Sequence, residues 1–364
     1  MEFGKVNEFD DKLFFKRSTV NISSSNRFST PLKASNPSEP ISEVNEIYKR
    51  FNTDSLDKII SDEKTERNKN SEVRRLKTEN NDFFFVDYNG NILPRKDHLE
   101  FLVDLQYSHS DVIITPIFST LMKNLEADKQ INTLIELTDK SLEIVKTLNN
   151  KQVLGLIPGQ LPRQSLKKLL KYYYNHGITC FAIDYDGRSV DSNSSWETGL
   201  TRIMAEYDII ENSFIYGLNV YQVHFRKNTM RELAKDFISI GYGIDILGCY
   251  HIQPRMGPKG WNEYKNKEKM HRFFDSSDYS YVRYLESELA KEGPIIDEEI
   301  KNYNIETQYT ESQILQEKLN ENDPLEPYIQ NKDKVTDKLI KDMLGLREEA
   351  LKNSNTAKLD KFFF

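Results

Sequence analysis

The feature that most constrains the fold is a series of short, continuous apolar segments that recur at intervals of roughly 25 to 40 residues through the middle of the chain. They consist mainly of Ile, Val, Leu and Phe, without the polar alternation of a strand that is exposed on one face. Such segments are typical of a parallel sheet that is covered on both faces. The segments are 83–90, 111–118, 152–160, 178–187, 213–220 and 242–249.

Segments with helical spacing lie between these strands. The helices are expected over 127–150, 162–177, 195–210 and 228–241. Regular alternation of strand and helix predicts an α/β fold whose parallel strands are joined by helical crossovers. Six such units, with room for two less obvious ones, favour a (β/α)₈ TIM barrel over an open doubly wound sheet. Neither GxGxxG nor a phosphate-binding P-loop follows any of these strands, so the usual nucleotide fingerprints are missing.

The sequences on either side of this repeating region have a different character. Residues 10–35 predict short strands, and 41–51 has the pattern of a short helix. The highly charged segment 61–82 has almost no apolar side chain to bury, so we expect a flexible surface insertion there. Charged sequences near the C-terminus predict one or two helices.

These patterns divide the chain into three expected parts. Residues 1–80 would form an N-terminal β segment that carries the charged flexible insertion. Residues 81–285 would form the TIM-barrel domain, and 286–364 a C-terminal helical extension. The chain has 364 residues and is 38% hydrophobic, which is enough for one large domain or two ordinary ones.

Charge and cysteine usage limit the function classes. The net charge is −7, so any contact with nucleic acid would depend on a local basic patch. The two cysteines, Cys180 and Cys249, match no metal-ligand spacing, and we predict neither a metal nor a cofactor. The opening "MEFGKVNEFDDKLFFKR" is charged throughout, and no apolar run approaches the ~18 residues of a membrane span. We therefore expect a cytoplasmic protein with no membrane contact.

Polar side chains gather where the predicted strands end, which is where the active sites of TIM barrels lie. The carboxylates near these strands are suited to acid–base or nucleophilic work. They are Asp87, Asp184, Asp186 and Asp245. Other candidates that could contact a substrate are Asn89, Gly159, Gln160, His251 and Arg255.

Each of these residues also has a purely structural interpretation. An Asp after a strand commonly caps the next helix or shapes a turn. Asp245 lies among apolar neighbours, so if it is buried it needs a partner such as Arg255 or a backbone donor. His224 and His251 lack a second metal ligand at short spacing and are more typical of surface or hydrogen-bonded histidines. Both interpretations stay open for the carboxylates.

Residues 241–257, "GYGIDILGCYHIQPRMG", resemble the "GIDxFDCxxPTRxxRxG" strand and loop of the tRNA-guanine transglycosylase superfamily. Other segments are similar in the same order, among them "FFFVDYNGNI" to "hLTDSGGFQ", "LGLIPGQ" to "FGIVQGG", and "GITCFAIDYDGRSV" to "GFDGYAIGGLSVGE". The likeness spans roughly residues 25 to 260. Members of that superfamily are (β/α)₈ enzymes that exchange a guanine in RNA, or in some relatives DNA, for a 7-deazaguanine.

The resemblance implies roles for particular residues. The family's general-base Asp falls on Asp87, which is retained. The base pocket would involve the 158–160 loop (Pro158, Gly159 and Gln160), with Gly90 and Tyr185 from neighbouring motifs. The implied partners are tRNA or DNA, a purine or 7-deazaguanine base, and a second copy or a related subunit in a homodimer or heterodimer.

Several departures from the family pattern bear on the mechanism. The base-reading Asp falls on Ile117, the Gln of "QGG" on Pro158, and the nucleophilic Asp of "FDC" on Gly248; the zinc-binding cysteines are missing. Asp245 lies three residues before Gly248, on the other face of a regular strand, so it replaces the lost carboxylate only if a bulge intervenes. Asp184 or Asp186 could supply a carboxylate from another strand.

Three hypotheses about function follow. The first is a divergent transglycosylase-like enzyme that exchanges or modifies a guanine or 7-deazaguanine in tRNA or DNA, with Asp87 as the acid–base group. The second is a non-catalytic paralogue that binds nucleic acid or partners an active transglycosylase subunit. The third is a (β/α)₈ enzyme with another substrate. Two carboxylates around an open pocket would favour the first, and a pocket filled by Ile117 and Pro158 would favour the second.

Overall fold

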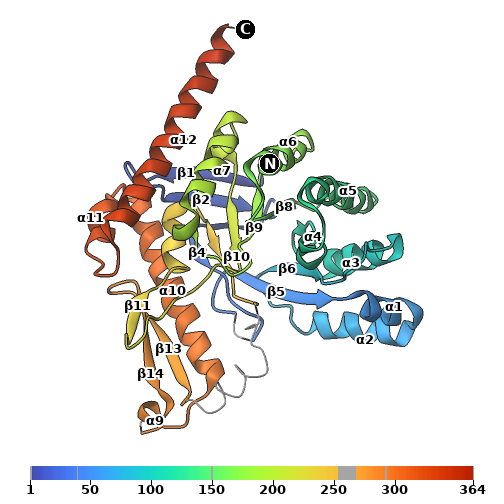
Figure 1. The fold of residues 1–364 in the computed structure, drawn as a ribbon, viewed down its shortest axis with the longest axis horizontal. Coiled ribbons are helices and arrows are strands. Elements are labelled where there is room, and N and C mark those ends of the chain that lie inside the picture. Colours follow the sequence, from blue (N-terminus) through green and yellow to red (C-terminus); the bar gives the residue numbers. More distant parts are fainter. Residues whose placement is uncertain (1, 39, 149–150, 253–267, 292, 364) are drawn as a thin grey trace.

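The structure is a computed structural model of the chain and describes residues 2–38, 40–148, 151–252, 268–291 and 293–363 (Figure 1). Its central element is a six-stranded sheet in the order β4-β12-β10-β9-β8-β7, in which all neighbouring strands are parallel. In chain order its strands are β4 (Leu32–Lys33), β7 (Ile113–Ile114), β8 (Val153–Pro158), β9 (Phe181–Asp184), β10 (Ile215–Leu218) and β12 (Ile246–Leu247). The prediction of an α/β fold with a parallel sheet is confirmed.

A second parallel pair is formed by β5 (Val44–Phe51) and β6 (Asn81–Tyr88), which are in register over their whole length. Isolated parallel bridges connect this pair to the residues beside the edge strands of the larger sheet. Ser35, next to β4, pairs with Asn45, and Ile117, beyond β7, pairs with Asp87. The carboxyl ends of the strands are thereby brought to a common side of the molecule.

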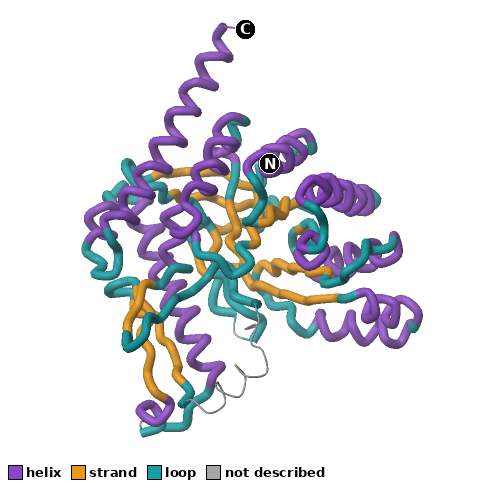
Figure 2. Tube along the Cα trace, viewed as in Figure 1, coloured by secondary structure: helices purple, strands orange, loops and turns teal. Residues whose placement is uncertain are grey.

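Helices cover the outer side of these strands, as Figures 1 and 2 show. They are α3 (Lys96–His109), α4 (Ser119–Lys123), α5 (Ala127–Lys146), α6 (Arg163–Asn175) and α7 (Ser194–Glu206), with short 3₁₀ turns η1 (Val190–Asn193) and η2 (Ile210–Asn212). On β6, Phe83 and Phe85 belong to the apolar cluster between the strands, whereas Phe84 and Val86 belong to the cluster beneath the helices. Burial on both faces explains why this strand has a continuous apolar sequence.

Two antiparallel sheets flank the parallel strands. The first is formed by β1 (Gly4–Phe9), β2 (Lys16–Asn21) and β3 (Arg27–Ser29), in the region where short strands were predicted. The second contains β11 (Arg231–Leu233), β14 (Ser280–Leu285) and β13 (Met270–Asp275) in that order. The sequence did not predict the second sheet.

The C-terminal region is helical, as predicted, and packs against the rest of the chain. Its elements are α9 (Glu286–Leu289), α10 (Asp297–Asn320), α11 (Leu325–Gln330) and α12 (Asp337–Phe363). Figure 1 shows α12 beside α7, with its end projecting from the body. Met343 and Leu346 of α12 are buried in the main apolar cluster, so the early part of this helix is anchored. No described helix is long and apolar enough to cross a membrane.

Three local predictions are wrong. The segment 41–51, expected to be a helix, is the strand β5. The charged segment 61–82, expected to be a flexible insertion, completes α1 (Thr53–Ser61) and forms α2 (Glu63–Arg74). The expected helix over 228–241 is instead β11 followed by the 3₁₀ turn η3 (Phe237–Tyr242).

Capping and tertiary pairing explain these differences. The side chain of Asp62 accepts hydrogen bonds from the main-chain nitrogens of Lys64 and Thr65, which satisfies the amino end of α2. Val73 of α2 is buried in the main apolar cluster, so this helix is anchored although most of its residues are charged or polar. For β5, pairing with the fully buried strand β6 overrides the local helical pattern.

Candidate functional site

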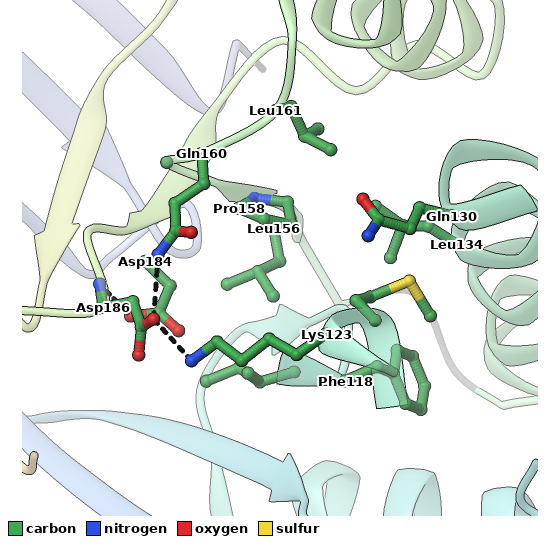
Figure 3. A pocket seen from close by; sticks show the side chains of 13 residues that line it. Phe118, Lys123, Gln130, Leu134, Leu156, Pro158, Gln160, Leu161, Asp184 and Asp186 are labelled. Atoms are coloured by element: carbon green, nitrogen blue, oxygen red, sulfur yellow. Dashed lines mark hydrogen bonds and ion pairs between the residues drawn. The ribbon is translucent and has the colours of Figure 1, made fainter. Parts of the chain in front are cut away.

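A pocket lies at the carboxyl ends of the parallel strands, between the ends of β8 and β9 and the helices α4 and α5 (Figure 3). Its cavity volume is about 130 Å³, which is small compared with the ~300–1,000 Å³ of pockets for drug-sized ligands. The lining residues are Ile117, Phe118, Met122, Lys123, Gln130, Leu134, Leu156, Pro158, Gly159, Gln160, Leu161, Asp184 and Asp186.

Asp184 is the last residue of β9 and the buried acid of this pocket. Its Oδ1 accepts hydrogen bonds from Asn219 Nδ2 at 2.9 Å and from the Asp186 main-chain nitrogen at 3.1 Å. Burial raises the pKa of Asp184 to about 6; these two hydrogen bonds oppose the rise, and the nearby charges of Asp186 and Asp87 add to it. A carboxyl group with a raised pKa on a pocket wall is a candidate proton donor or acceptor.

Asp186 has a different environment at the mouth of the same pocket. Its Oδ2 lies 2.5 Å from Lys123 Nζ and accepts a hydrogen bond from Gln160 Nε2 at 2.8 Å, as Figure 3 shows. Its backbone has a φ of 48°, in the left-handed region that Asp tolerates better than most residues. This ion pair holds the Lys123 ammonium group and the Asp186 carboxylate together at the edge of the pocket.

Asp87 lies on β6, which is connected to the larger sheet beyond β7, and is almost completely buried. Its Oδ2 accepts hydrogen bonds from Arg50 Nε at 2.7 Å and Tyr48 Oη at 2.8 Å, both from β5. Burial and the adjacent Asp87 charge raise the pKa of Tyr48 far above its usual value, so the tyrosine remains a donor. Oδ1 of Asp87 is buried and has no hydrogen-bond partner within the described part of the chain. Buried acceptors without a partner are uncommon in proteins.

Further polar residues connect Asp87 and Asp184 with the end of β12. The Tyr48 ring stacks on the His251 ring with a centroid distance of 4.2 Å and an interplanar angle of 8°. Asn219, which donates to Asp184, also accepts a hydrogen bond from the His251 main-chain nitrogen at 2.8 Å. We call Glu46, Tyr48, Asp87, Asp184, Asn219 and His251 the strand-end cluster.

Glu46 occupies the space beside Gly248. A Cβ atom added to Gly248 would lie 2.5 Å from Glu46 Oε2 and 2.6 Å from Cε1 of Tyr216, so no larger residue fits there without movement. The Glu46 carboxylate accepts hydrogen bonds from Tyr216 Oη, from His251 Nε2, and from the Cys249 main-chain nitrogen at 2.9 Å. The position that the resemblance assigned to a nucleophilic carboxylate therefore adjoins a carboxylate from another strand.

Asp245 does not join this cluster. It precedes the first residue of β12, whereas His251 follows the strand. Its carboxylate is fully buried and forms an ion pair with Lys16 Nζ at 2.9 Å. It also accepts hydrogen bonds from Ser18, Thr30 and the Ile215 main-chain nitrogen. These contacts tie the N-terminal sheet to the parallel strands and give Asp245 a structural role.

The other predicted residues are distributed as follows. Pro158, Gly159 and Gln160 line the pocket. Tyr185 is buried in the core beneath the helices and is not among the residues that line the pocket. Asn89 accepts a hydrogen bond from Thr120.

Gly90 is not among the residues that line the pocket, and its main chain packs against the Tyr88 side chain. Arg255 lies outside the described residues. Within them, Asp245 has Lys16 as its ion-pair partner.

Glu46, Tyr48 and Arg50 were not predicted as site residues, because the pattern of their segment indicated a helix. A signal was present, since these polar residues occupy every second position between Val44 and Phe51, as expected for one face of a strand. Lys123 was also missed. Its role depends on a contact with Asp186 that is 63 positions distant in the sequence.

The structural role of Asp245 is tested by Asp245→Ala, which leaves the buried Lys16 ammonium without its counter-ion. The free energy of unfolding should fall by about 3–5 kcal/mol. Glu63→Ala is the matched control, because it removes a carboxylate from the exposed pair with Arg67 and should change stability by less than ~1 kcal/mol. Denaturant unfolding of both variants measures the difference, and equally small losses would contradict the assignment.

The raised pKa of Asp184 predicts a pH-dependent effect of Asp184→Asn. Because the folded-state pKa of about 6 lies above the ordinary value of 3.8, the ionised carboxylate destabilises the fold. The penalty is absent below about pH 4, grows as the pH rises and is complete above about pH 6. Asn keeps the acceptor oxygen, so the variant should be more stable by up to ~3 kcal/mol at about pH 8 and unchanged at about pH 3.5. Unfolding curves that show no gain at the higher pH would contradict the burial argument.

Neither a scan against models of protein families nor a search of curated proteins finds a match to this chain. The similarity to the transglycosylases therefore depends on short motifs in a common order and stays an interpretation. The function is argued below from the site's own geometry.

Proposed function

We propose that this protein is a (β/α)₈ barrel enzyme that binds a purine-like base in the pocket beside Asp184 and exchanges or modifies a guanine or 7-deazaguanine in tRNA or DNA. The observation that carries the proposal is the Asp184 carboxyl group, which is buried on a pocket wall with its pKa raised to about 6. A neutral carboxyl group can donate a hydrogen bond to a base and can release a proton near neutral pH.

The strand pairings support a closed barrel. The six-stranded sheet ends in β4 on one side and β7 on the other. Main-chain hydrogen bonds of 2.9 and 2.8 Å link Ser35 to Val44 and Glu46, beside β4. Bonds of 2.9 and 2.8 Å link Ile117 to Val86 and Tyr88, beyond β7. With β5 and β6 between these two edges, eight parallel strands could complete a ring.

The walls of the pocket suit a heteroaromatic base. The apolar surface is supplied by Ile117, Phe118, Leu156 and Pro158. Ile117 and Pro158 stand where the resemblance implies polar residues, and they still leave an open volume of about 130 Å³. The same pocket is also lined by polar side chains. These are Asp184 and the hydrogen-bonded pair of Gln160 and Asp186. A few polar groups on an apolar cavity are the usual arrangement for recognising a small ligand.

The acid–base role is assigned to Asp87, which lies on β6 and is not among the residues that line the pocket. Arg50 and Tyr48 occupy Oδ2, and Oδ1 is buried without a partner in the described part of the chain, so Oδ1 would take a proton from a ligand only if the strand-end cluster opened. Asp87 is also near enough to contribute to the raised pKa of Asp184. Two acidic groups in different environments, Asp184 without a cation and Asp87 beside Arg50, can divide the work of taking and giving a proton.

A second candidate function is favoured by the environment of Gly248. The position that would carry a nucleophilic carboxylate has no side chain, and the adjacent Glu46 is fully buried and hydrogen-bonded to three groups. A carboxylate without access to solvent cannot attack a sugar carbon unless the cluster rearranges. The alternative is therefore a paralogue that binds a base or nucleic acid, or partners an active subunit, without transferring the glycosyl group.

The enzyme hypothesis predicts that the protein incorporates labelled guanine or 7-deazaguanine into tRNA or DNA. Asp87→Asn should abolish incorporation without unfolding the chain, because Asn still accepts from Arg50 and Tyr48 but cannot take up a proton. Scintillation counting of recovered nucleic acid measures the product. Glu63→Gln, on an exposed helix, is the matched control and should retain the full rate.

The alternatives are separated by the same assay with calorimetry. Binding of guanine with no incorporation by the unmutated protein would favour the non-catalytic paralogue. Absence of both binding and incorporation would remove the transglycosylase proposal altogether.

A further inference from the structure

We propose that His251 is a second proton-accepting group of this site, that Glu46 positions it, and that it contacts the sugar of a nucleoside whose base lies in the Asp184 pocket. The identity of the ligand rests on the proposed function, whereas the pairing of the two side chains stands on the geometry alone. The resemblance assigns no role to either residue of this pair beyond the general placement of His251 near the substrate.

The contact with Glu46 determines which ring nitrogen of His251 carries the proton. Its Nε2 lies in hydrogen-bond contact with Glu46 Oε1. Burial alone would raise the pKa of Glu46, but the charge and hydrogen bond of His251, the hydrogen bond from Tyr216 and the charge of Lys33 outweigh burial and lower it. The ionised carboxylate can only accept, so Nε2 must carry the proton. The lone pair of the neutral ring is therefore on Nδ1.

The imidazole ring of His251 is held in one orientation. The Tyr48 ring covers one of its faces, and the main-chain nitrogen of His251 is hydrogen-bonded to Asn219. The side chain nevertheless remains 25% exposed, in contrast to the fully buried Glu46. No partner of Nδ1 is recorded among the residues that the structure describes. A fixed histidine with an accessible basic nitrogen is suited to proton transfer.

The charged and titratable groups that face His251 come from three different strands. Glu46 and Tyr48 approach from β5, and Asp87 is hydrogen-bonded to Tyr48 from β6. Lys33, at the end of β4, is turned toward the Gly248 carbonyl oxygen at 2.6 Å. Burial raises the pKa of the Cys249 thiol to about 12, so Cys249 stays neutral and Glu46 is the anion that stabilises the imidazolium.

The chemical step is a simple proton transfer. Nδ1 of the neutral ring takes a proton from a hydroxyl group of the bound ligand, which leaves an alkoxide-like oxygen on the ligand and an imidazolium on His251. The Glu46 carboxylate then faces a full positive charge through Nε2–H. Asn219 places this histidine beside Asp184, because it is hydrogen-bonded to both residues. A base held at Asp184 would therefore direct its sugar toward the end of β12.

The test uses diethyl pyrocarbonate, which acylates neutral, accessible imidazole nitrogens, with peptide mass spectrometry as the readout. In the unliganded protein His251 should be labelled, and guanosine should slow its labelling at least several-fold. The exposed His224 is the internal control and should react equally with and without guanosine. Free guanine, which lacks the sugar, should bind but protect His251 less.

Variants test the positioning role. Glu46→Gln should slow the labelling of His251, because an amide can donate as well as accept and no longer holds the proton on Nε2. Glu63→Gln makes the same change of side chain in the exposed pair with Arg67, so it should leave the labelling rate unchanged. Circular dichroism and thermal unfolding confirm that each variant is folded before it is labelled.

The outcomes separate this inference from the proposed function. If His251 is not labelled while His224 is, or if Glu46→Gln labels at the unmutated rate, the inference is overturned. If calorimetry detects guanosine binding but His251 is not protected, the inference fails and the proposed pocket survives. If neither guanine nor guanosine binds, the proposed function fails and the sugar contact fails with it.

Discussion

Parallel pairing of the strands is the constraint on which the rest of the structure depends. The main-chain ladder from β8 through β9 and β10 to β12 fixes the register of residues that are far apart in the sequence. Side chains at successive strand ends consequently meet on one side of the molecule. The bridge between Asp87 and Ile117 extends this register to β6. Without it, the acidic groups of the strand-end cluster would be unrelated residues on separate loops.

The local environments of the four carboxyl groups at this end of the molecule decide what each can do. Asp87 has a guanidinium partner in Arg50, Asp186 is paired with Lys123, and Glu46 is paired with His251. Asp184 receives hydrogen bonds only from neutral donors in the described part of the chain. Burial without a cation is what raises its pKa and favours the neutral acid. Three of these carboxyl groups thus have a basic partner, whereas Asp184 has none in the described part of the chain and its pKa is raised to about 6.

The sequence predicted the parts of the fold that depend on local pattern. Continuous apolar segments located β6, β8, β9 and β10, and Gly177, with a φ of 71°, marked the end of α6. The strand β5 was mistaken for a helix because its inward-facing positions carry Glu46, Tyr48 and Arg50, which interrupt the apolar pattern expected of a buried strand. Of the predicted site, Asp184, Asp186 and the 158–160 loop do line one pocket. Two contacts could not be predicted from any local pattern, because each joins segments over 200 residues apart. Asp245 pairs with Lys16, and Glu46 packs beside Gly248.

The central claim is that Asp184 is a buried acid whose proton is retained to near-neutral pH. Carbon-13 NMR of the protein with labelled aspartate carboxyl groups tests this directly, with Asp184→Asn to assign the resonance. The account predicts a titration midpoint near pH 6 for that carboxyl group. A midpoint near the ordinary value of 3.8 would mean that the group is solvated or paired with a cation, and the proposed chemistry of the pocket would have no basis.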